Sequence, residues 1–148
     1  MNEPIFQAVT FALAVLGAVL GVINTYLAID KSRVKLRVVP KHAIPYGDVD
    51  PRLTFCIEVT NLSAFAVTIE EVGVRLAGSR QRLLLDGKRT LDGGQWPRRL
   101  EPRTSVTVYA QSPRSPRGER LHAAYTTTAC GVTRTGTSPA FRQLAAGQ

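Results

Sequence analysis

The sequence predicts a mainly β protein, an antiparallel β-sandwich of about seven strands that follows one N-terminal transmembrane helix. The first observation is that no charged residue lies between Glu3 and Asp30. The second is that apolar and polar residues alternate in short runs beyond this stretch, which is typical of half-buried strands. The third is that turn-forming residues interrupt these runs at intervals of about ten residues. We therefore expect an anchor at 1–30, a β-sandwich at 31–140 and a C-terminal tail at 141–148.

The segment from Pro4 to Ile29 is predicted to be a retained membrane anchor. Each helical residue rises ~1.5 Å, so about twenty residues cross a hydrocarbon core that is roughly 30 Å thick. The first four residues lack the basic charge of a signal peptide, and the apolar run ends without a small-x-small cleavage site. A cleaved signal peptide and a buried core helix are the less favoured alternatives.

Small residues within the anchor allow it to self-associate. Gly17 and Gly21 form a small-xxx-small step, which Ala14 extends on one side and Asn24 and Thr25 on the other. Small residues let two helix backbones approach closely, and an amide can hydrogen-bond across the contact. A homodimer through this helix is therefore one hypothesis, although Gly and Ala are frequent in any transmembrane helix.

Basic residues follow the anchor directly. They are Lys31, Arg33, Lys35, Arg37 and Lys41. The short N-terminal tail has no Lys or Arg, so the positive-inside rule predicts a single-pass protein of the cell membrane with its C-terminal domain in the cytoplasm. The same five residues are expected to contact the anionic head groups of the lipid bilayer.

The net charge also limits which kinds of partner are expected. All 19 Lys and Arg and ten of the 11 acidic residues lie at Asp30 or later, so this part carries a net charge of about +9. Such a charge can attract nucleic acid or anionic lipid, and the anchor favours lipid. Aromatic residues make up 7% of the chain and provide no visible series of base-stacking platforms, so no nucleic-acid partner is expected.

Seven runs after the anchor are predicted to be strands. They cover residues 34–38, 53–60, 66–76, 82–85, 105–109, 121–129 and 132–135. We expect the second and third runs to pair as a hairpin, Asp86 and Gly87 to form a turn, and the last two runs to turn at Cys130 and Gly131. No later segment has a helical pattern, so residues 141–148 are expected to be a frayed tail.

Several motifs in these runs carry a family resemblance. They are Ile57-Glu58-Val59-Thr60-Asn61, Val67-Thr68-Ile69, and Leu100-Glu101-Pro102 leading into Val106-Thr107-Val108. This pattern resembles immunoglobulin-like domains of bacterial surface and membrane proteins, and the layout is similar to that of uncharacterised bacterial and prophage single-pass membrane proteins. The resemblance implies an immunoglobulin-like β-sandwich after a membrane helix, and it carries no known activity. Trp96 beside Pro97, and the lack of a Tyr two residues before Cys130, depart from antibody-type domains.

The search for catalytic residues yields one weak candidate. Cys130 and His122 are the one available pair of a nucleophile and a base, but neither residue stands in a recognisable local signature. Two cysteines 74 positions apart and two separated histidines lack the spacing of zinc ligands. Phosphate-binding glycine motifs are absent from the sequence. We expect no enzymatic activity, no metal and no cofactor, with a Cys130–His122 hydrolase as a less favoured alternative.

A disulfide between Cys56 and Cys130 is a further hypothesis. The two fall in the predicted second and penultimate strands, where sandwich domains often place a bridge between their sheets. However, Cys56 shares a face with Thr54 and Glu58, opposite the apolar residues of its strand, so it is expected to point away from the core.

The sequence thus favours a membrane-anchored, non-enzymatic interaction or scaffold module that binds an unidentified protein partner or lies on the membrane surface. The alternative is an extracytoplasmic structural or adhesive subunit with a Cys56–Cys130 disulfide. Topology and the state of the two thiols distinguish these hypotheses.

Overall fold

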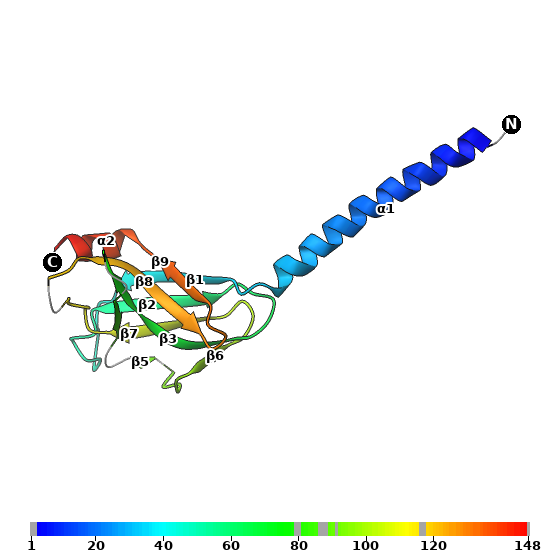
Figure 1. Ribbon diagram of the computed structural model, residues 1–148. Coiled ribbons are helices and arrows are strands. Elements are labelled where there is room, and N and C mark those ends of the chain that lie inside the picture. The colour runs from blue at the N-terminus through cyan, green and yellow to red at the C-terminus, as the bar shows by residue number, and fades with distance from the viewer. Residues whose placement is uncertain (1–2, 79–80, 86–88, 91, 116–117, 148) are drawn as a thin grey trace. The chain divides into compact units, whose positions relative to one another are not determined.

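The computed structural model describes residues 3–78, 81–85, 89–90, 92–115 and 118–147. The chain divides into two compact units, Met1–Arg33 and Val34–Gln148. The first unit is a helix and the second is an antiparallel β domain that ends in a short helix (Figure 1). The prediction of mainly antiparallel β structure after an N-terminal apolar helix is therefore confirmed.

Helix α1 covers Glu3–Ser32, a length of 30 residues. Its mean hydropathy reaches 2.2 over its most apolar window, and none of its residues is buried. The hydroxyl groups of Thr10 and Thr25 donate hydrogen bonds to the carbonyl oxygens four residues earlier, at 2.8 and 2.9 Å. The helix is therefore long and apolar enough to cross a membrane, and its two threonine hydroxyls have hydrogen-bond partners within the helix.

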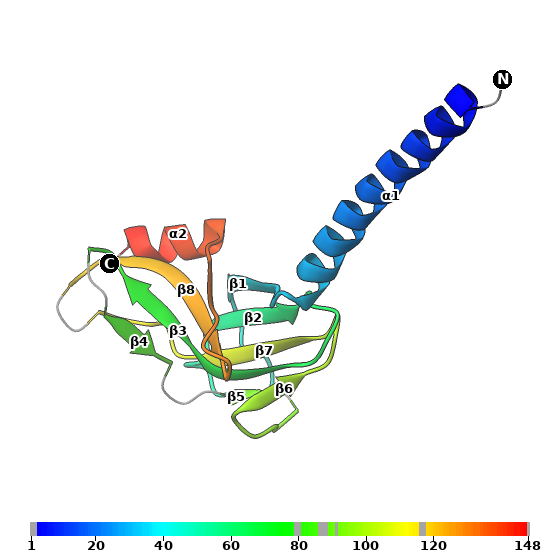
Figure 2. The ribbon, with the colours of Figure 1, turned by 45° about the vertical axis from the view of Figure 1, so that its right-hand side comes forward.

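The β domain contains nine strands and one helix among the residues that the structure describes. They are β1 (Leu36–His42), β2 (Phe55–Asn61), β3 (Val67–Leu76), β4 (Arg82–Leu84), β5 (Arg89–Thr90), β6 (Arg98–Leu100), β7 (Ser105–Ala110), β8 (Leu121–Thr128), β9 (Thr133–Gly136) and α2 (Pro139–Ala146). One sheet has the order β1-β2-β7-β5. The other has the order β4-β3-β8-β9, and β6 also pairs with β3. Both views of the ribbon show the two sheets as separate layers (Figure 2).

Two of the sequence expectations about strands were wrong. The strands number nine instead of seven because β5 and β6, of two and three residues, are too short to produce a visible alternation. The second and third predicted runs do not form a hairpin: β2 pairs with β1 and β7, whereas β3 lies in the other sheet and pairs with β8. The predicted turn at Asp86 and Gly87 lies outside the described residues.

The first strand also extends further than expected. It runs to His42 and includes Pro40, whereas the predicted run ended at residue 38. Proline is tolerated here because β1 ends the hydrogen-bonded order of its sheet, where a missing amide proton interrupts no second ladder. Lys35 and Arg37 are exposed and Val38 is buried, as the alternation predicted.

The core lies between the two sheets and is built from aliphatic residues of both, chiefly Val, Ile and Leu of β2, β3, β7 and β8. Its described buried members include Phe55, Ile57, Val59, Ile69, Val72, Val74, Leu100, Val106, Val108, Leu121 and Ala124. Trp96 is partly buried and packs against this cluster from outside a strand. Alternation along each strand therefore decides which residues fill the core.

The C-terminal segment is a helix and not a frayed tail. The Oγ of Ser138 accepts a hydrogen bond from the amide of Phe141 at 3.1 Å and donates one to the carbonyl of Pro40. Pro139 occupies the first turn, where its missing amide proton costs nothing. Phe141 is 2% exposed, and its ring centroid lies 6.1 Å from that of Phe55. A capping serine and one buried aromatic thus hold this short helix on the core.

Candidate functional site

The small residues of α1 leave an open strip on the helix surface. No heavy atom lies within 4 Å of a Cβ placed at Gly17 or at Gly21. Leu20, Asn24 and Leu27 border a shallow hollow around Gly21. The sequence predicted close approach of a second helix at this strip, and that remains a prediction.

The five basic residues that were expected to contact lipid are spread along the chain. Lys31 and Arg33 belong to the helical unit, and the other three belong to the β domain. Lys35 precedes β1, whereas Lys41 lies close to the other end of that strand, about 20 Å away at roughly 3.3 Å per residue. Lys41 forms an ion pair with Glu58, and hydrogen bonding to that carboxylate raises the pKa of the lysine. Lys41 therefore does not belong to one cluster with Lys35.

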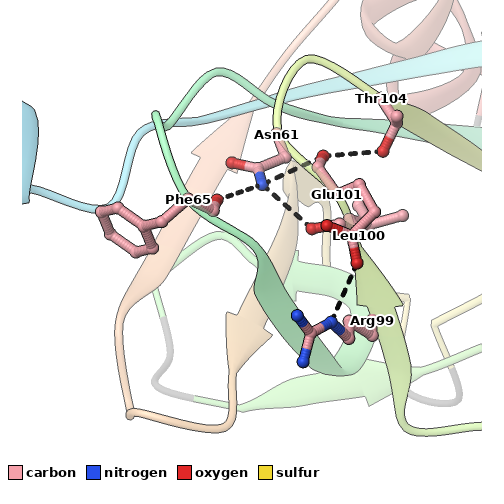
Figure 3. A network of polar contacts seen from close by, with 6 residues as sticks. All are labelled: Asn61, Phe65, Arg99, Leu100, Glu101 and Thr104. Carbon is pink, nitrogen blue, oxygen red and sulfur yellow. Dashed lines mark hydrogen bonds and ion pairs between the residues drawn. The ribbon is translucent and has the colours of Figure 1, made fainter.

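A buried asparagine organises the end of the β domain at which the chain enters. Asn61 is fully buried at the end of β2, and its Nδ2 donates to the carbonyl oxygens of Phe65, Leu100 and Glu101 at 2.8, 3.1 and 3.3 Å (Figure 3). Its Oδ1 accepts from the amide of Ser63 at 2.9 Å. One side chain thus joins the β2–β3 loop to the segment that follows β6.

The β2–β3 loop is also tied to the first residues of the domain. The Oγ of Ser63 accepts from the amide of Lys35 at 2.8 Å, and the amide of Leu62 donates to the carbonyl of Lys35 at 2.8 Å. With Ser63 buried, two apolar side chains of the loop remain exposed, Leu62 at 41% and Phe65 at 37%. Figure 3 shows the ring of Phe65 turned away from Asn61.

Two arginines and the β8–β9 hairpin lie at the same end. The amide of Arg103 donates to the carbonyl of Asn61 at 2.9 Å, and the guanidinium of Arg134 donates to the carbonyl of Val34 at 3.3 Å. The amide of Ala129 donates to the carbonyl of Thr68 at 2.9 Å, which places the hairpin beside the start of β3. We call this surface the entry end and define it by Val34, Leu62, Phe65, Arg103, Cys130 and Arg134.

The two cysteines are free thiols. Cys56 is buried on the face of β2 that points away from the core cluster, as predicted, and desolvation raises the pKa of its thiol. Cys130 is exposed in the β8–β9 turn, 3.1 Å from the hydroxyl of Thr128. Hydrogen bonds from that hydroxyl and from the amide of Val132 lower the pKa of the Cys130 thiol.

His122 does not lie beside Cys130. His122 is the second residue of β8, and Cys130 lies two positions beyond Thr128, the last residue of that strand. At roughly 3.3 Å per residue, the strand alone separates them by about 20 Å. The pair is therefore far beyond the hydrogen-bond reach that general-base activation of a thiol requires.

A buried tyrosine on the outer face of the second sheet was not predicted. Tyr125 is fully buried. It does not belong to the core cluster between the sheets, whereas its neighbour Ala124 does. Its hydroxyl donates to a carboxylate oxygen of Glu71, and the guanidinium carbon of Arg82 lies 5.2 Å from its ring centroid. Desolvation and the hydrogen bond to Glu71 strongly raise the pKa of Tyr125. Gly73, a glycine inside the predicted strand 66–76, is the sequence signal that could have revealed the packing of Tyr125, because it lies opposite this tyrosine on the neighbouring strand.

The β1–β2 loop forms the far end of the domain. It borders a hollow of about 470 Å³, whose lining includes Ile44, Tyr46, Arg89 and Tyr109. Ile44 and Tyr46 are 93% and 92% exposed. In the same loop, hydrogen bonds from Arg52 lower the pKa of Asp50 to about 2.

No group of three or more His, Cys, Asp and Glu that could hold a metal ion is present in the described part of the chain. Comparison with models of known protein families and with curated proteins found no match to this chain.

Proposed function

We propose that this chain is a single-pass membrane protein whose β domain is a non-enzymatic interaction module. The observation that carries the proposal is helix α1, with 30 residues, a mean hydropathy of 2.2 over its most apolar window and no buried residue. About twenty such residues suffice to cross a bilayer. In water, this helix would expose a contiguous apolar surface that soluble monomers rarely tolerate. A lipid bilayer is the environment that removes this cost.

We further propose that the β domain is an immunoglobulin-like sandwich. In the constant-type immunoglobulin fold, strands A, B, E and D form one sheet and strands C, F and G the other. If β1, β2, β3, β5, β7, β8 and β9 are lettered A to G, the two sheets of this domain read A-B-E-D and C-F-G, with β4 beside C. This agreement in strand order supports the assignment.

The cytoplasmic side is the proposed location of the β domain. Lys31 and Arg33 follow the span directly, and the N-terminal tail has no Lys or Arg. Free thiols at Cys56 and Cys130 suit a reducing compartment. The alternative, an extracytoplasmic adhesive or structural subunit, requires a bridge between these cysteines. It has less support because Cys56 is buried and faces away from the core.

A protein partner is proposed for the far end of the domain. Tyr46, Tyr109 and Arg89 border its hollow beside Ile44. Tyrosine and arginine are enriched where proteins contact one another, because they combine large contact area with hydrogen-bonding groups. The family resemblance described above suggests a bacterial or phage setting for this partner.

Membrane fractionation of the full chain in a bacterial host tests the anchor. We expect the protein to remain in the membrane pellet after alkaline carbonate extraction. Replacing Leu16 and Leu20 by Arg is expected to release it, because each arginine at the centre of a span costs about 2.5–3.5 kcal/mol. The matched control is Leu84→Arg, at a residue of the β domain that is 60% exposed. A wild-type chain in the soluble fraction would refute the anchor.

Topology is tested by C-terminal fusions. If the domain is cytoplasmic, a C-terminal fusion to green fluorescent protein is fluorescent and a C-terminal fusion to alkaline phosphatase is inactive. An active phosphatase would instead support the extracytoplasmic alternative.

A further inference from the structure

We propose that the entry end of the β domain is a second membrane contact, at which Leu62 and Phe65 enter the interfacial layer of an anionic bilayer beside Arg103 and Arg134. This inference rests on the proposed anchor. It goes beyond the anchor because it assigns a lipid-binding surface to residues of the folded domain, far from α1 in the sequence.

Chain length places this end within reach of lipid head groups. Val34, the first residue of the β domain, lies four positions after Asp30, the first charged residue beyond the span. Four residues extend over at most about 14 Å. The head-group layer is roughly 5–7 Å thick on each side of the hydrocarbon core. Val34 is therefore at most about 14 Å from Asp30, which leaves the first residues of the β domain within reach of the head groups.

Hydrogen bonds hold the exposed loop beside Val34. Leu62 and Ser63 bind the backbone of Lys35, and Asn61 binds the carbonyl of Phe65. The loop is therefore fixed at the level at which the chain enters the domain. Its exposed side chains are one aromatic and one aliphatic, the types that insert between head groups and acyl chains.

The charge of the entry end suits anionic lipid. Its connecting segments are 34–35, 62–66, 101–104 and 129–132. Across these segments the sole acidic residue is Glu101, which forms an ion pair with Arg99 at 2.9 Å. Arg103 and Arg134 are exposed there, and long basic side chains beside apolar ones are typical of segments that lie on membranes.

The far end is less suited to the same role, although Ile44 and Tyr46 are more exposed than Leu62 and Phe65. The register of β1 and β2 places the two ends on opposite sides of a seven-residue ladder, about 20 Å apart. The far loop also carries two acidic residues, Asp50, which forms an ion pair with Arg52, and Asp48, which anionic lipid repels.

Site-specific fluorescence of the full chain tests the inference. An environment-sensitive dye is attached at Phe65→Cys in a chain that also carries Cys56→Ala and Cys130→Ser. The matched control is the same dye at Tyr46→Cys, an exposed aromatic position of the far end. Leu62→Cys provides a second entry-end site, and Trp96 fluorescence verifies folding. The chains are reconstituted in vesicles of phosphatidylcholine and phosphatidylserine that contain a lipid with a nitroxide near its head group.

We expect quenching at positions 65 and 62 and little at 46. Replacing Arg103 and Arg134 by Gln is expected to lower the ratio of β domains docked on the membrane to undocked β domains about fivefold per charge at low salt. The control substitutions Arg114→Gln and Arg120→Gln, between β7 and β8, should leave it unchanged. Vesicles of phosphatidylcholine alone should weaken the quenching of the wild-type surface.

Each other outcome contradicts the inference. If the chain sediments with the vesicles but the dyes at 65 and 62 remain in water, the anchor stands and the second contact is refuted. Equal quenching at 46 and 65 refutes a contact specific to the entry end. A folded chain that does not sediment with the vesicles refutes the anchor and the contact together.

Discussion

Gly73 on β3 lies directly opposite Tyr125 on β8, and a Cβ at position 73 would stand 2.8 Å from a ring carbon of that tyrosine. The same Cβ would stand 2.3 Å from the backbone carbonyl oxygen of Leu83. The missing side chain at Gly73 therefore leaves room for the tyrosine ring beside it on the outer face of the sheet, where Arg82 also contacts that ring. An aromatic that covers a glycine on a neighbouring strand is a known means of pinning strand register.

Replacing Gly73 by Ala is expected to destabilise the β domain by about 1–3 kcal/mol, because the neighbouring backbone cannot yield as a side chain can. Urea unfolding followed by the fluorescence of Trp96 measures the change. Gly17→Ala is the control, since no atom lies within 4 Å of its Cβ position and it lies outside the β domain. An unchanged unfolding midpoint for Gly73→Ala would contradict the packing described here.

Replacing Asn61 by Ala is expected to cost about 2–4 kcal/mol, because it removes the Nδ2 donor from the carbonyl groups of Phe65 and Leu100, whereas the carbonyl of Glu101 keeps its hydrogen bond from Thr104. Asn61→Asp should be similarly harmful, since a carboxylate accepts and cannot donate to these carbonyls. The same urea titration reports the loss. A variant with wild-type stability would show that these hydrogen bonds do not hold the loop.

The raised pKa of Tyr125 predicts that the β domain loses stability at alkaline pH. This raised pKa means that the folded state favours the protonated phenol. The stability that it contributes is fully present below the unfolded pKa of about 10 and is lost as the pH rises beyond that value. We expect the free energy of unfolding to fall above about pH 10 in the wild type and to fall less steeply in Tyr125→Phe. Parallel curves for the two proteins would contradict this assignment.

The two thiols should differ in reactivity. Cys130 is exposed with a lowered pKa, so we expect it to react with a maleimide or disulfide reagent in the folded protein, and its rate to rise at a lower pH than that of an ordinary cysteine. Cys56 should react after unfolding in urea, because it is buried and its pKa is raised. Mass spectrometry of the labelled peptides separates the two sites. Equal labelling of both in the folded state would argue against this structure of β2.

Self-association of helix α1 is a separate prediction. Replacing Gly17 and Gly21 by Leu is expected to abolish any dimer seen by cross-linking in vesicles, because large side chains separate the two backbones. Val15→Leu is a volume-increasing control on the same helix. A dimer that survives the glycine substitutions would place the contact elsewhere.

Part of this fold could be predicted because it depends on local pattern alone. The uncharged run up to Asp30 predicts a spanning helix by its length, and alternation predicted strands at β2, β3, β7 and β8. Alternation also predicted that Cys56 faces away from the core. The failures have local causes too. Strands β5 and β6 are too short to show an alternation of apolar and polar residues, and α2 is held by the N-cap Ser138 and the buried ring of Phe141.

What the sequence by itself determined is therefore the long apolar helix, the basic residues that follow it and the faces of the longer strands, since each follows from the pattern of consecutive residues. The tertiary structure decided which strands pair, because hydrogen bonds between distant segments carry no mark in the sequence. It separated β2 from β3, although the two are consecutive. It also brought the loop of Phe65, and Arg134, to the residues that follow α1, through backbone contacts of Lys35 and Val34. The entry end exists because segments far apart along the chain converge there.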